Sequence, residues 1–429
     1  MGYRASLDYL YSLQRFGIKL GLENTFRLLE RLGNPQQGLR IVHIAGTNGK
    51  GSTAAALAAI LDAAGLRVGR YTSPHLHSFT ERIQINGKPV CEATVAGLVA
   101  EIRPAAAELS TTFFEFATAL ALLHFQRCAV DWVVLEVGMG GRLDATNVVT
   151  PELTLVTPIS LDHAEHLGNS LKAVAGEKAG IFKPGVPVLS ARQPLEAEQV
   201  IRERARRLQA PLFLAGKDFS WRAADGGFSY QGLELVLDGL FPGLVGRHQW
   251  ENLSLALAAA ELLQCREPKL DVAALRCGIA AVRWPGRLEW FPGQVLLDGA
   301  HNPAGAAVLG DYLAEQGLER IHLVVGLKAD KAFQGVLTPL LPRTARLYAC
   351  TPPVEAAVAP AALADFSRSV GVPAEVFSSP EQALDAALAA REGNATVLVA
   401  GSLFLVAQLR EKIQAMLPSR HFTAYSAGR

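Results

Sequence analysis

The order of apolar and polar segments predicts a chain in which β-strands and α-helices alternate. Short apolar runs rich in β-branched residues, typical of buried parallel strands, are separated by longer stretches of helix-forming composition. The predicted strands cover residues 41–45, 66–71, 132–138, 153–157, 187–189, 294–298, 321–325, 346–349 and 396–400. The predicted helices cover residues 6–31 (as one helix or two), 92–107, 112–128 and 196–208, and a long alanine-rich helix opens at 246–252. Such alternation is typical of three-layer α/β domains.

Three segments interrupt this alternation. Asn86-Gly87 separates two short apolar runs and is a strong hairpin signal. Residues 215–240 alternate polar and apolar positions with glycines, which predicts a small antiparallel segment. Residues 284–289 are predicted to be a seam, because the alternation of strands and helices restarts after them. We therefore predict two domains, residues 1–290 and residues 291–429.

The strongest candidate for chemistry follows the first predicted strand. The segment Gly46-Thr47-Asn48-Gly49-Lys50-Gly51-Ser52 leads directly into an alanine-rich helix. Strand, glycine turn and helix in this order form a phosphate cradle, where backbone N–H groups and the helix N-terminus face the anion and Lys50 adds a charge. The generic P-loop pattern has Gly where this chain has Ile44, and Ser or Thr where this chain has Gly51, so the match is imperfect. An ordinary glycine turn is the alternative, but three glycines and a lysine in one turn favour phosphate binding.

The predicted fold class is therefore α/β, with a P-loop-type parallel-sheet ATPase domain followed by a smaller Rossmann-like α/β domain. In such folds the ligand sites lie outside the carboxyl ends of the strands. Two polar loops of the second domain, Asp298–Pro303 and Gly326–Lys331, follow predicted strands and are expected at such a site.

Polar residues also gather at the predicted strand ends of the first domain. Ser73 lies in a loop, residues 72–82, that is rich in hydroxyls and histidines. Glu136 is a carboxylate within an apolar run, and such a group is rarely buried without a partner. His163 lies in the loop after the strand at 153–157. Oxygen donors with one imidazole suit Mg²⁺ or Mn²⁺; a solvated loop, a structural acid and a structural histidine are the alternatives.

Two further features have an ordinary structural interpretation. Lys178 lies near the end of a predicted helix, where a lysine is usually exposed and favoured by the helix dipole. Phe113, Phe114 and Phe116 open another helix. An aromatic cluster on a helix usually belongs to the core, although the same rings could wall a flat heterocycle.

Composition and charge exclude several classes of protein. Half of the 429 residues are hydrophobic, which is enough for two cored domains, and the formal net charge of +1 gives no global field for a nucleic acid. The five cysteines form no C-x-x-C pair, which predicts reduced thiols and no zinc site. Neither an apolar signal core nor a run of about 20 apolar residues occurs. We expect a soluble cytoplasmic protein without a membrane or nucleic-acid partner.

Together these motifs resemble those of folylpolyglutamate synthase/dihydrofolate synthase, within the Mur ligase superfamily. The matching segments are Gly46–Ser52, Thr72–His75, Leu135–Asn147, Ser160–His163, Glu177–Gly180, Trp284–Glu289, Asp298–Pro303 and Gly401–Leu403. They occur in family order and span nearly the whole chain. The family often has tyrosine after the Gly-Ser-Leu motif, where this chain has Phe404, so one peripheral hydroxyl contact is lost.

The resemblance implies an ATP-dependent ligase that joins L-glutamate to a pteroate or folate carboxylate through an acyl phosphate. It implies ATP and two Mg²⁺ ions as cofactors, with K⁺ as a further candidate, and small molecules as the only partners of a monomer. Dihydrofolate synthesis, glutamate-chain extension or both remain open. Ala145 beside Asp144 weakly favours both.

The resemblance also implies roles for individual residues. Lys50, Lys178 and His301 are implied to be catalytic, and Lys178 matches the lysine that family members N-carboxylate. The implied ATP contacts are Thr47, Asn48, Gly49, Lys50, Gly51, Ser52, Asn252, Arg287 and Asp298. The implied metal ligands are Ser73, Glu136 and His163, with Ser52 near the nucleotide metal. The implied substrate contacts are Thr112, Phe114 and Asp144 for a pterin, and Ser402 for glutamate or the reacting phosphate.

Two other functions compete with this one. A Mur-type ligase acting on a cell-wall nucleotide would be expected to carry a UDP-binding N-terminal domain, and only about forty residues precede the phosphate loop strand. A non-ligase nucleotide-binding module would hydrolyse or bind ATP without forming an amide, and would leave residues 298–303 without a role.

Overall fold

The computed structural model describes residues 2–17 and 21–416 of the chain. The chain forms two compact units. The first unit comprises Met1–Gly243 and Gln249–Arg283, and the second comprises Leu244–His248 and Trp284–Arg429. The short segment Leu244–His248 thus belongs to the second unit although its chain neighbours on both sides belong to the first.

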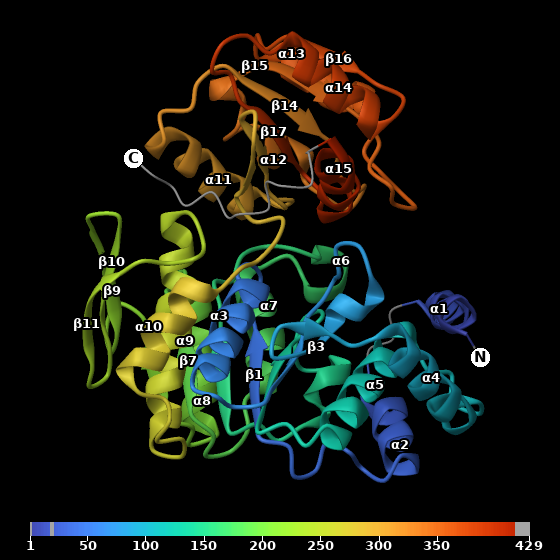
Figure 1. Cartoon of the computed structure of the whole chain (residues 1–429), viewed down its shortest axis with the longest axis vertical. Coiled ribbons are helices and arrows are strands. Elements are labelled where there is room, and N and C mark those ends of the chain that lie inside the picture. Colours follow the sequence, from blue (N-terminus) through green and yellow to red (C-terminus); the bar gives the residue numbers. More distant parts are fainter. Residues whose placement is uncertain (1, 18–20, 417–429) are drawn as a thin grey trace. The chain divides into compact units, whose positions relative to one another are not determined.

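The first unit is built on an eight-stranded sheet in the order β4-β3-β2-β5-β1-β6-β7-β8 (Figure 1). Its strands are β1 (Ile41–Ala45), β2 (Val68–Tyr71), β3 (Ile83–Ile85), β4 (Lys88–Pro89), β5 (Trp132–Glu136), β6 (Leu153–Val156), β7 (Val188–Ser190) and β8 (Leu212–Leu214). Strands β2, β5, β1, β6, β7 and β8 are mutually parallel, while β3 and β4 form the predicted hairpin and run antiparallel. All five residues of β1 are buried, as the apolar run predicts for a central strand.

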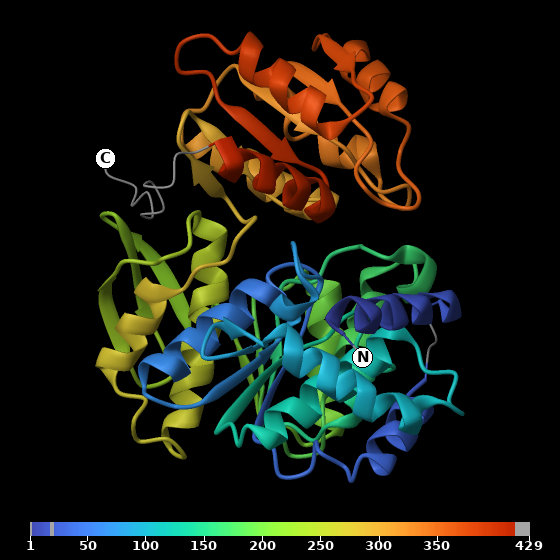
Figure 2. The same cartoon turned by 45° about the vertical axis from the view of Figure 1, so that its right-hand side comes forward.

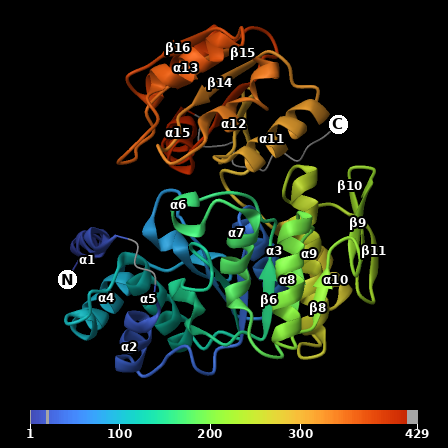
Figure 3. The ribbon, with the colours of Figure 1, turned by 180° about the vertical axis from the view of Figure 1, so that it is seen from behind.

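Helices cover this sheet, as Figures 1 and 3 show. They are α1 (Tyr3–Ser12), α2 (Glu23–Arg31), α3 (Lys50–Ala63), α4 (Glu92–Ala106), α5 (Phe113–Arg127), α6 (Ala164–Leu167), α7 (Leu171–Lys178), α8 (Leu195–Arg207), α9 (Arg247–Gln264) and α10 (Val272–Ala281). Gly278 lets helices α3 and α10 pack closely, since a Cβ at this position would lie only 2.4 Å from Ile60 Cα. On the face of β1 that carries Ile41, the core is completed by α1, α2, α4 and α5.

A separate three-stranded antiparallel sheet confirms the prediction for residues 215–240. It consists of β9 (Ser220–Ala224), β10 (Gly227–Gln231) and β11 (Val236–Leu240). Phe228 stacks on Trp250 of α9, with ring centroids 5.8 Å apart, which attaches the sheet to that helix.

The second unit has a six-stranded sheet in the order β12-β13-β17-β14-β15-β16. Its strands are β12 (Glu289–Phe291), β13 (Val295–Leu297), β14 (Ile321–Val325), β15 (Thr344–Ala349), β16 (Ala374–Val376) and β17 (Val397–Ala400). All neighbours are parallel except β12, which is antiparallel to β13. Its helices are α11 (Pro303–Glu315), α12 (Phe333–Leu337), α13 (Pro360–Ser369), α14 (Pro380–Ala390) and α15 (Leu403–Met416).

The helices of the second unit form two layers around the sheet (Figure 2). Helices α11, α12 and α13 share a core with Leu296 and Leu323, whereas α14 and α15 share a core with Leu297 and Val324. Successive strand residues point to opposite faces, so the two cores lie on opposite sides of the sheet. The predicted α/β class is confirmed for both units, with mixed but mainly parallel sheets. Among the described residues, no helix combines the length and the apolar character that a membrane span needs.

Candidate active site

The glycine turn after β1 is shaped by two positions that admit no side chain. Gly46 and Gly49 have φ values of 148° and 88°. A Cβ on Gly46 would lie 1.8 Å from Thr157 Oγ1, and one on Gly49 would lie 2.2 Å from Asn252 Oδ1. The close approach of Asn252 places this α9 residue at the turn, and its amide nitrogen donates to Gln249 Oε1 at 2.9 Å. Both positions therefore need glycine, because their positive φ values disfavour other residues and because a side chain would collide with its neighbours.

Hydrogen bonds hold the turn against the loop that leaves β6. The backbone N–H groups of Thr47 and Asn48 donate to Pro158 O at 3.0 and 3.2 Å, and the Thr47 hydroxyl donates to Ser160 O at 3.0 Å. Helix α3 then begins at Lys50 with Gly49 as N-cap and without a side-chain cap. The first N–H groups of α3 are thus the ones available to an anion, in line with a phosphate cradle.

Two lysines converge on a single carbonyl oxygen of this turn. Lys50 Nζ donates to Gly46 O at 3.1 Å and to Thr47 O at 3.1 Å, and Lys178 Nζ donates to Gly46 O at 2.7 Å. Lys178 is only 4% exposed, which excludes the alternative of an ordinary surface lysine, and its hydrogen-bond partner is 132 residues away in the chain. Burial, and next the nearby Lys50 cation, lower the pKa of Lys178 to about 7.

The end of α7 is buried because a glycine-rich loop, residues 138–144, packs on it. A Cβ on Gly141 would lie 2.7 Å from Glu177 O, and one on Gly180 would lie 2.3 Å from Arg142 Cβ. Arg142 also donates to Glu177 Oε1 at 2.8 Å. The charged, glycine-rich sequence after β5 therefore serves to bring this loop against the segment that carries Lys178.

The candidate metal ligands are only partly brought together. Glu136, at the end of β5, is buried, and its Oε2 accepts the backbone N–H of Ser73 at 3.1 Å. His163 is exposed, with φ of 52°, and its carbonyl starts α6. Within residues 2–17 and 21–416, no cluster of three His, Cys, Asp or Glu side chains is arranged to hold a metal. A buried carboxylate with a serine beside it suits a hard cation such as Mg²⁺, but the set needs further oxygen donors.

The candidate pterin residues lie around the start of α5 and the loop after β5. Thr112 is the N-cap of α5, with its hydroxyl accepting the N–H of Glu115 at 3.3 Å. The ring of Phe114 rests on Gly138, where a Cβ would lie 2.3 Å from Phe114 Cζ. Asp144 is buried, and its carboxylate accepts the N–H groups of Met139 at 2.8 Å and Thr146 at 3.0 Å. Burial raises the pKa of Asp144, partly offset by these bonds.

A buried arginine beside these residues was not singled out from the sequence. Arg82 is 8% exposed, and its Nε donates to His75 Nδ1 at 2.7 Å. Its guanidinium lies 5.2 Å from the ring centre of Phe113, and burial lowers its pKa. The sequence feature that could have pointed to Arg82 is its place at the end of the polar loop 72–82. A cation in such a loop is ordinarily solvated, so its burial was not expected.

The second unit assembles its own candidate residues at the carboxyl ends of β13 and β17. Asp298 Oδ2 accepts the N–H of Leu288 at 2.9 Å, and Oδ1 accepts the N–H of Ala300 at 2.8 Å. The Arg287 guanidinium lies against Gly299, where a Cβ would be 2.5 Å from Arg287 Nη1. The loop thus lies beside the Arg287 turn.

His301 and Ser402 lie in adjacent turns of the same unit. His301 Nδ1 bonds Gly299 O at 2.8 Å, and because a carbonyl only accepts, Nδ1 carries the proton and Nε2 is the basic nitrogen. Gly401 N donates to Ala300 O at 2.9 Å, which ties the two turns together. Ser402 is buried, and its hydroxyl accepts the N–H of Phe404 at 3.2 Å at the start of α15.

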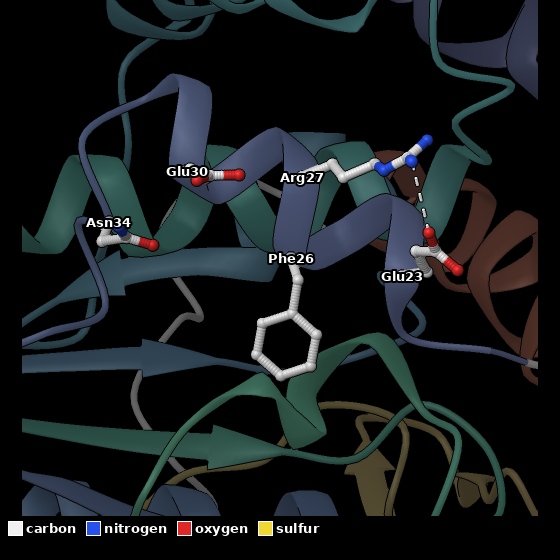
Figure 4. Close-up of a pocket in the computed structure, with 5 residues that line it drawn as sticks. All are labelled: Glu23, Phe26, Arg27, Glu30 and Asn34. Atoms are coloured by element: carbon white, nitrogen blue, oxygen red, sulfur yellow. Dashed lines mark ion pairs between the residues drawn. The ribbon is translucent and has the colours of Figure 1, made fainter.

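A surface pocket lies apart from all of these residues. Figure 4 shows it on α2, lined by Glu23, Phe26, Arg27, Glu30 and Asn34. Arg27 Nη2 and Glu23 Oε1 form an ion pair at 3.4 Å. None of the predicted site residues lines this pocket.

Comparison with known proteins defines the class of protein. Residues 44–260 match the model of the Mur ligase middle domain, and residues 286–403 match the model of the Mur ligase glutamate ligase domain. The chain belongs to the Mur ligase family. Within it, the chain is of the folylpolyglutamate synthase/dihydrofolate synthase type: an ATP-dependent ligase that adds glutamate to dihydropteroate or folates.

Full-length relatives support this assignment. Dihydrofolate synthase/folylpolyglutamate synthase of Bacillus subtilis is 35% identical over 433 residues, covering 96% of this chain and 99% of the relative. The structure of E. coli FolC in complex with DHPP and ADP has a TM-score of 0.88 and 34% identity, covering 96% of this chain and 98% of that one. A bifunctional folylpolyglutamate synthase/dihydrofolate synthase with Mn, AMPPNP and L-glutamate bound has a TM-score of 0.87 and 36% identity, with the same coverage.

Proposed function

We propose that this chain carries both activities of its family, adding L-glutamate to dihydropteroate and to reduced folates through an acyl phosphate. The observation that carries the proposal is the convergence of Lys50 and Lys178 on Gly46 O, beside the uncapped start of α3. The Lys50 cation and the N–H groups at the start of α3 suit a reaction that builds negative charge at this point, and Lys178 brings a second reactive side chain to it. The relatives that bear both names, and that bind DHPP, AMPPNP, Mn and L-glutamate, favour the same chemistry.

In the first step, an oxygen of the substrate carboxylate attacks the γ-phosphorus of ATP and ADP leaves. Lys50 would exchange its bonds to Gly46 O and Thr47 O for phosphate oxygens, and the N–H groups of Gly51 and Ser52 would donate to them. Asn252 at the turn, with Thr47, Asn48 and Gly49, would complete the nucleotide contacts. Arg287 and Asp298 of the second unit would contact phosphate and ribose.

The metal sites would be formed by this chain's hard donors. Ser73, Glu136 and His163 would hold one divalent ion, and Ser52 would lie near the nucleotide's ion. Such an ion neutralises the charge that develops on transferring phosphoryl oxygens. Glu136 is buried beside Ser73, which supports their part in the set, whereas His163 would have to turn from its exposed position.

Lys178 would supply the missing oxygen donors after N-carboxylation. Its neutral amine would add to CO₂, forming a C–N bond and releasing one proton, and the product is an anionic carbamate. A pKa of about 7 supports this, because about half of the amine is then neutral and nucleophilic at neutral pH. The carbamate would also face the Lys50 cation instead of opposing a like charge.

In the second step, the amine of glutamate attacks the acyl carbon, a C–N bond forms and phosphate leaves. The ammonium of free glutamate must first lose a proton, and His301 Nε2 is suited to accept it, since Nδ1–H is held by Gly299 O. Ser402 lies directly before α15, whose first turn has no acidic residue. Its hydroxyl would donate a hydrogen bond to a glutamate carboxylate or to the phosphate.

The pterin end of the substrate would be held by the α5 side of the first unit. Phe114 offers a ring face beside Gly138, and Asp144 offers a carboxylate that suits the N–H donors of a pterin ring. Thr112 at the α5 N-terminus would add a hydroxyl.

The test is phosphate release measured separately with dihydropteroate and with tetrahydrofolate, each with and without L-glutamate. We expect release that needs both substrates in each series, and a product heavier by one glutamyl residue in mass spectrometry. Chelation of divalent ions should stop both reactions, and added Mg²⁺ or Mn²⁺ should restore them. Activity with only one acceptor would contradict the bifunctional proposal, and ATP turnover independent of both substrates would contradict the ligase chemistry.

A further inference from the structure

One fully buried histidine has no role in the reaction outlined above. His43 lies in the middle of β1, three residues before Gly46, and its side chain is 0% exposed. Its Nε2 lies 2.9 Å from Thr146 Oγ1, in the short 3₁₀ turn Ala145–Val148 that follows Asp144. Burial, and next the charge of Lys183, lower the pKa of His43 to about 3, so the ring is neutral.

The direction of each hydrogen bond in this chain of groups follows from Asp144. Its carboxylate can only accept while it is ionised, so the Thr146 hydroxyl, 2.5 Å from Asp144 Oδ1, donates to it. The single hydroxyl proton is then used, and His43 Nε2 must donate to Thr146 Oγ1. The tautomer is therefore Nε2–H, and Nδ1 is an acceptor that is buried without a hydrogen-bond partner.

An unpartnered buried acceptor costs free energy, and an apolar residue at this position of β1 would avoid the cost. The hydrogen bond from His43 Nε2 to Thr146 Oγ1 offsets the cost of the unpartnered Nδ1. That bond fastens the 3₁₀ turn to the strand that leads into the phosphate loop. Asp144 is in turn fixed by Thr146 N and by Met139 N, and the adjacent Gly138 supports the ring of Phe114.

We propose that His43 and Thr146 are positioning residues that orient Asp144, and through it the pteridine ring of the substrate, relative to strand β1. The inference rests on the substrate role proposed for Asp144. It assigns to the two residues an effect on the affinity for the pteridine substrate and not on ATP binding, because the hydrogen bonds of the Thr146 hydroxyl join His43 to Asp144 and not to the phosphate turn. Asp144 would touch the substrate, whereas His43 and Thr146 act only through it.

The test compares Thr146→Val, which removes the hydroxyl and keeps the shape, with Thr146→Ser, which keeps the hydroxyl. For Thr146→Val we expect the KM for dihydropteroate to rise about tenfold, the equivalent of one lost hydrogen bond, while the KM for ATP stays within about twofold. Thr146→Ser should behave as the wild type. Thermal unfolding is recorded for each variant. Equal KM changes for ATP and dihydropteroate, or equal losses in both variants, would overturn the positioning role.

The part played by His43 is tested in the same assay. His43→Leu should raise the KM for dihydropteroate, and His43→Gln, whose side-chain amide can place a donor near Thr146, should restore it. The double variant His43→Leu/Thr146→Val should have the KM of Thr146→Val alone, because both changes remove one interaction. Additive effects would contradict action through Thr146.

Failure of the inference is distinguishable from failure of the proposed function. An Asp144→Asn variant with an unchanged KM for dihydropteroate would refute the substrate role of Asp144. A Thr146→Val variant with an unchanged KM would refute the positioning role, even if Asp144→Asn is impaired.

Discussion

The phosphate turn of the first unit and the Asp298 loop of the second unit hold their charged side chains in opposite ways. In the first unit, the charged groups at the phosphate turn are cations that donate to backbone carbonyls, as Lys50 and Lys178 do at Gly46 O. In the Asp298 loop of the second unit, a carboxylate accepts backbone N–H groups, as Asp298 does from Leu288 and Ala300. In the first case backbone carbonyls receive their hydrogen bonds from lysines, and in the second case backbone N–H groups donate theirs to a carboxylate. A ligand at the phosphate turn therefore meets cationic donors, whereas a ligand at the Asp298 loop meets an acceptor.

The difference predicts how each site responds to substitution. A lysine that leaves a carbonyl for a phosphate gains a stronger partner, and the turn keeps its shape through Gly46, Gly49 and the bonds to Pro158. Asp298 has no such freedom, since moving its carboxylate would release two N–H groups that shape its own loop. Substitution of Lys50 should therefore affect chemistry more than stability, and substitution of Asp298 should affect both.

The largest expected effect is that of Lys50→Ala. Without the cation, the negative charge of the transferring phosphoryl group loses a direct partner, and kcat should fall by about 10³-fold. The melting temperature should change little, because Gly46 O keeps its hydrogen bond from Lys178, and the turn keeps the bonds from Thr47 N and Asn48 N to Pro158 O. Lys88→Ala, at an exposed lysine, is the matched control in the phosphate-release assay. Wild-type turnover by Lys50→Ala would refute the phosphate role.

The buried ammonium of Lys178 should make stability depend on pH. Its pKa is about 7 in the folded chain against an ordinary value of about 10.5, so the unfolded chain binds more protons between these values. The free energy of unfolding should therefore rise with pH across this window, while below pH 7 the full cost of the buried cation is present. Lys178→Met removes the buried cation and its cost, and should be more stable than the wild type at pH 6 by at most about 5 kcal/mol.

The difference in the free energy of unfolding between Lys178→Met and the wild type should shrink as the pH approaches 10. Urea unfolding of the variant and of the wild type in CO₂-free buffer at pH 6, 8 and 9.5 measures this difference. A constant difference across the series would contradict the lowered pKa.

The next expected effect tests the chemical form of Lys178. Lys178→Ala should lower kcat by about 10²-fold, and small carboxylic acids such as acetate should restore part of it by occupying the space of the carbamate. Lys172→Ala, an exposed lysine on the same helix, should be neutral with or without acetate. Loss of activity without any rescue would favour the free amine over the carbamate.

The glycines that flank α3, Gly49 before it and Gly65 after it, separate crowding at the phosphate turn from backbone strain alone. Gly49→Ala would place a Cβ 2.2 Å from Asn252 Oδ1 at a φ of 88°, so the turn or Asn252 must move, and the KM for ATP should rise about tenfold. Gly65→Ala, after α3, has a φ of 74° and no atom within 4 Å of the added Cβ. It should cost only backbone strain, about 1 kcal/mol in urea unfolding, with the KM for ATP unchanged. Equal ATP effects in both would contradict the crowding at Gly49.

Much of the fold could be predicted from local pattern, because strands buried on both faces are continuous apolar runs and the turn at Gly46–Ser52 has its chemistry in adjacent residues. The strands β8, β12 and β16 were not predicted, since each has three residues and no longer apolar run marks it. The burial of Lys178 could not be predicted either. It depends on Gly141 and Gly180, which let a loop from another part of the chain cover the end of α7.

The smallest expected effect returns to the second unit. In Asp298→Asn only one amide oxygen can accept, so the N–H of Leu288 or of Ala300 loses its partner. We expect a loss of about 1–2 kcal/mol in the free energy of unfolding and a several-fold fall in kcat, because the loop also carries His301. Asp311→Asn, at an exposed position of α11, is the control for both measurements. A fall in kcat without any loss of stability would mean that Asp298 resembles the lysines of the first unit, with its carboxylate free to serve a ligand, and the contrast between the two units would then be wrong.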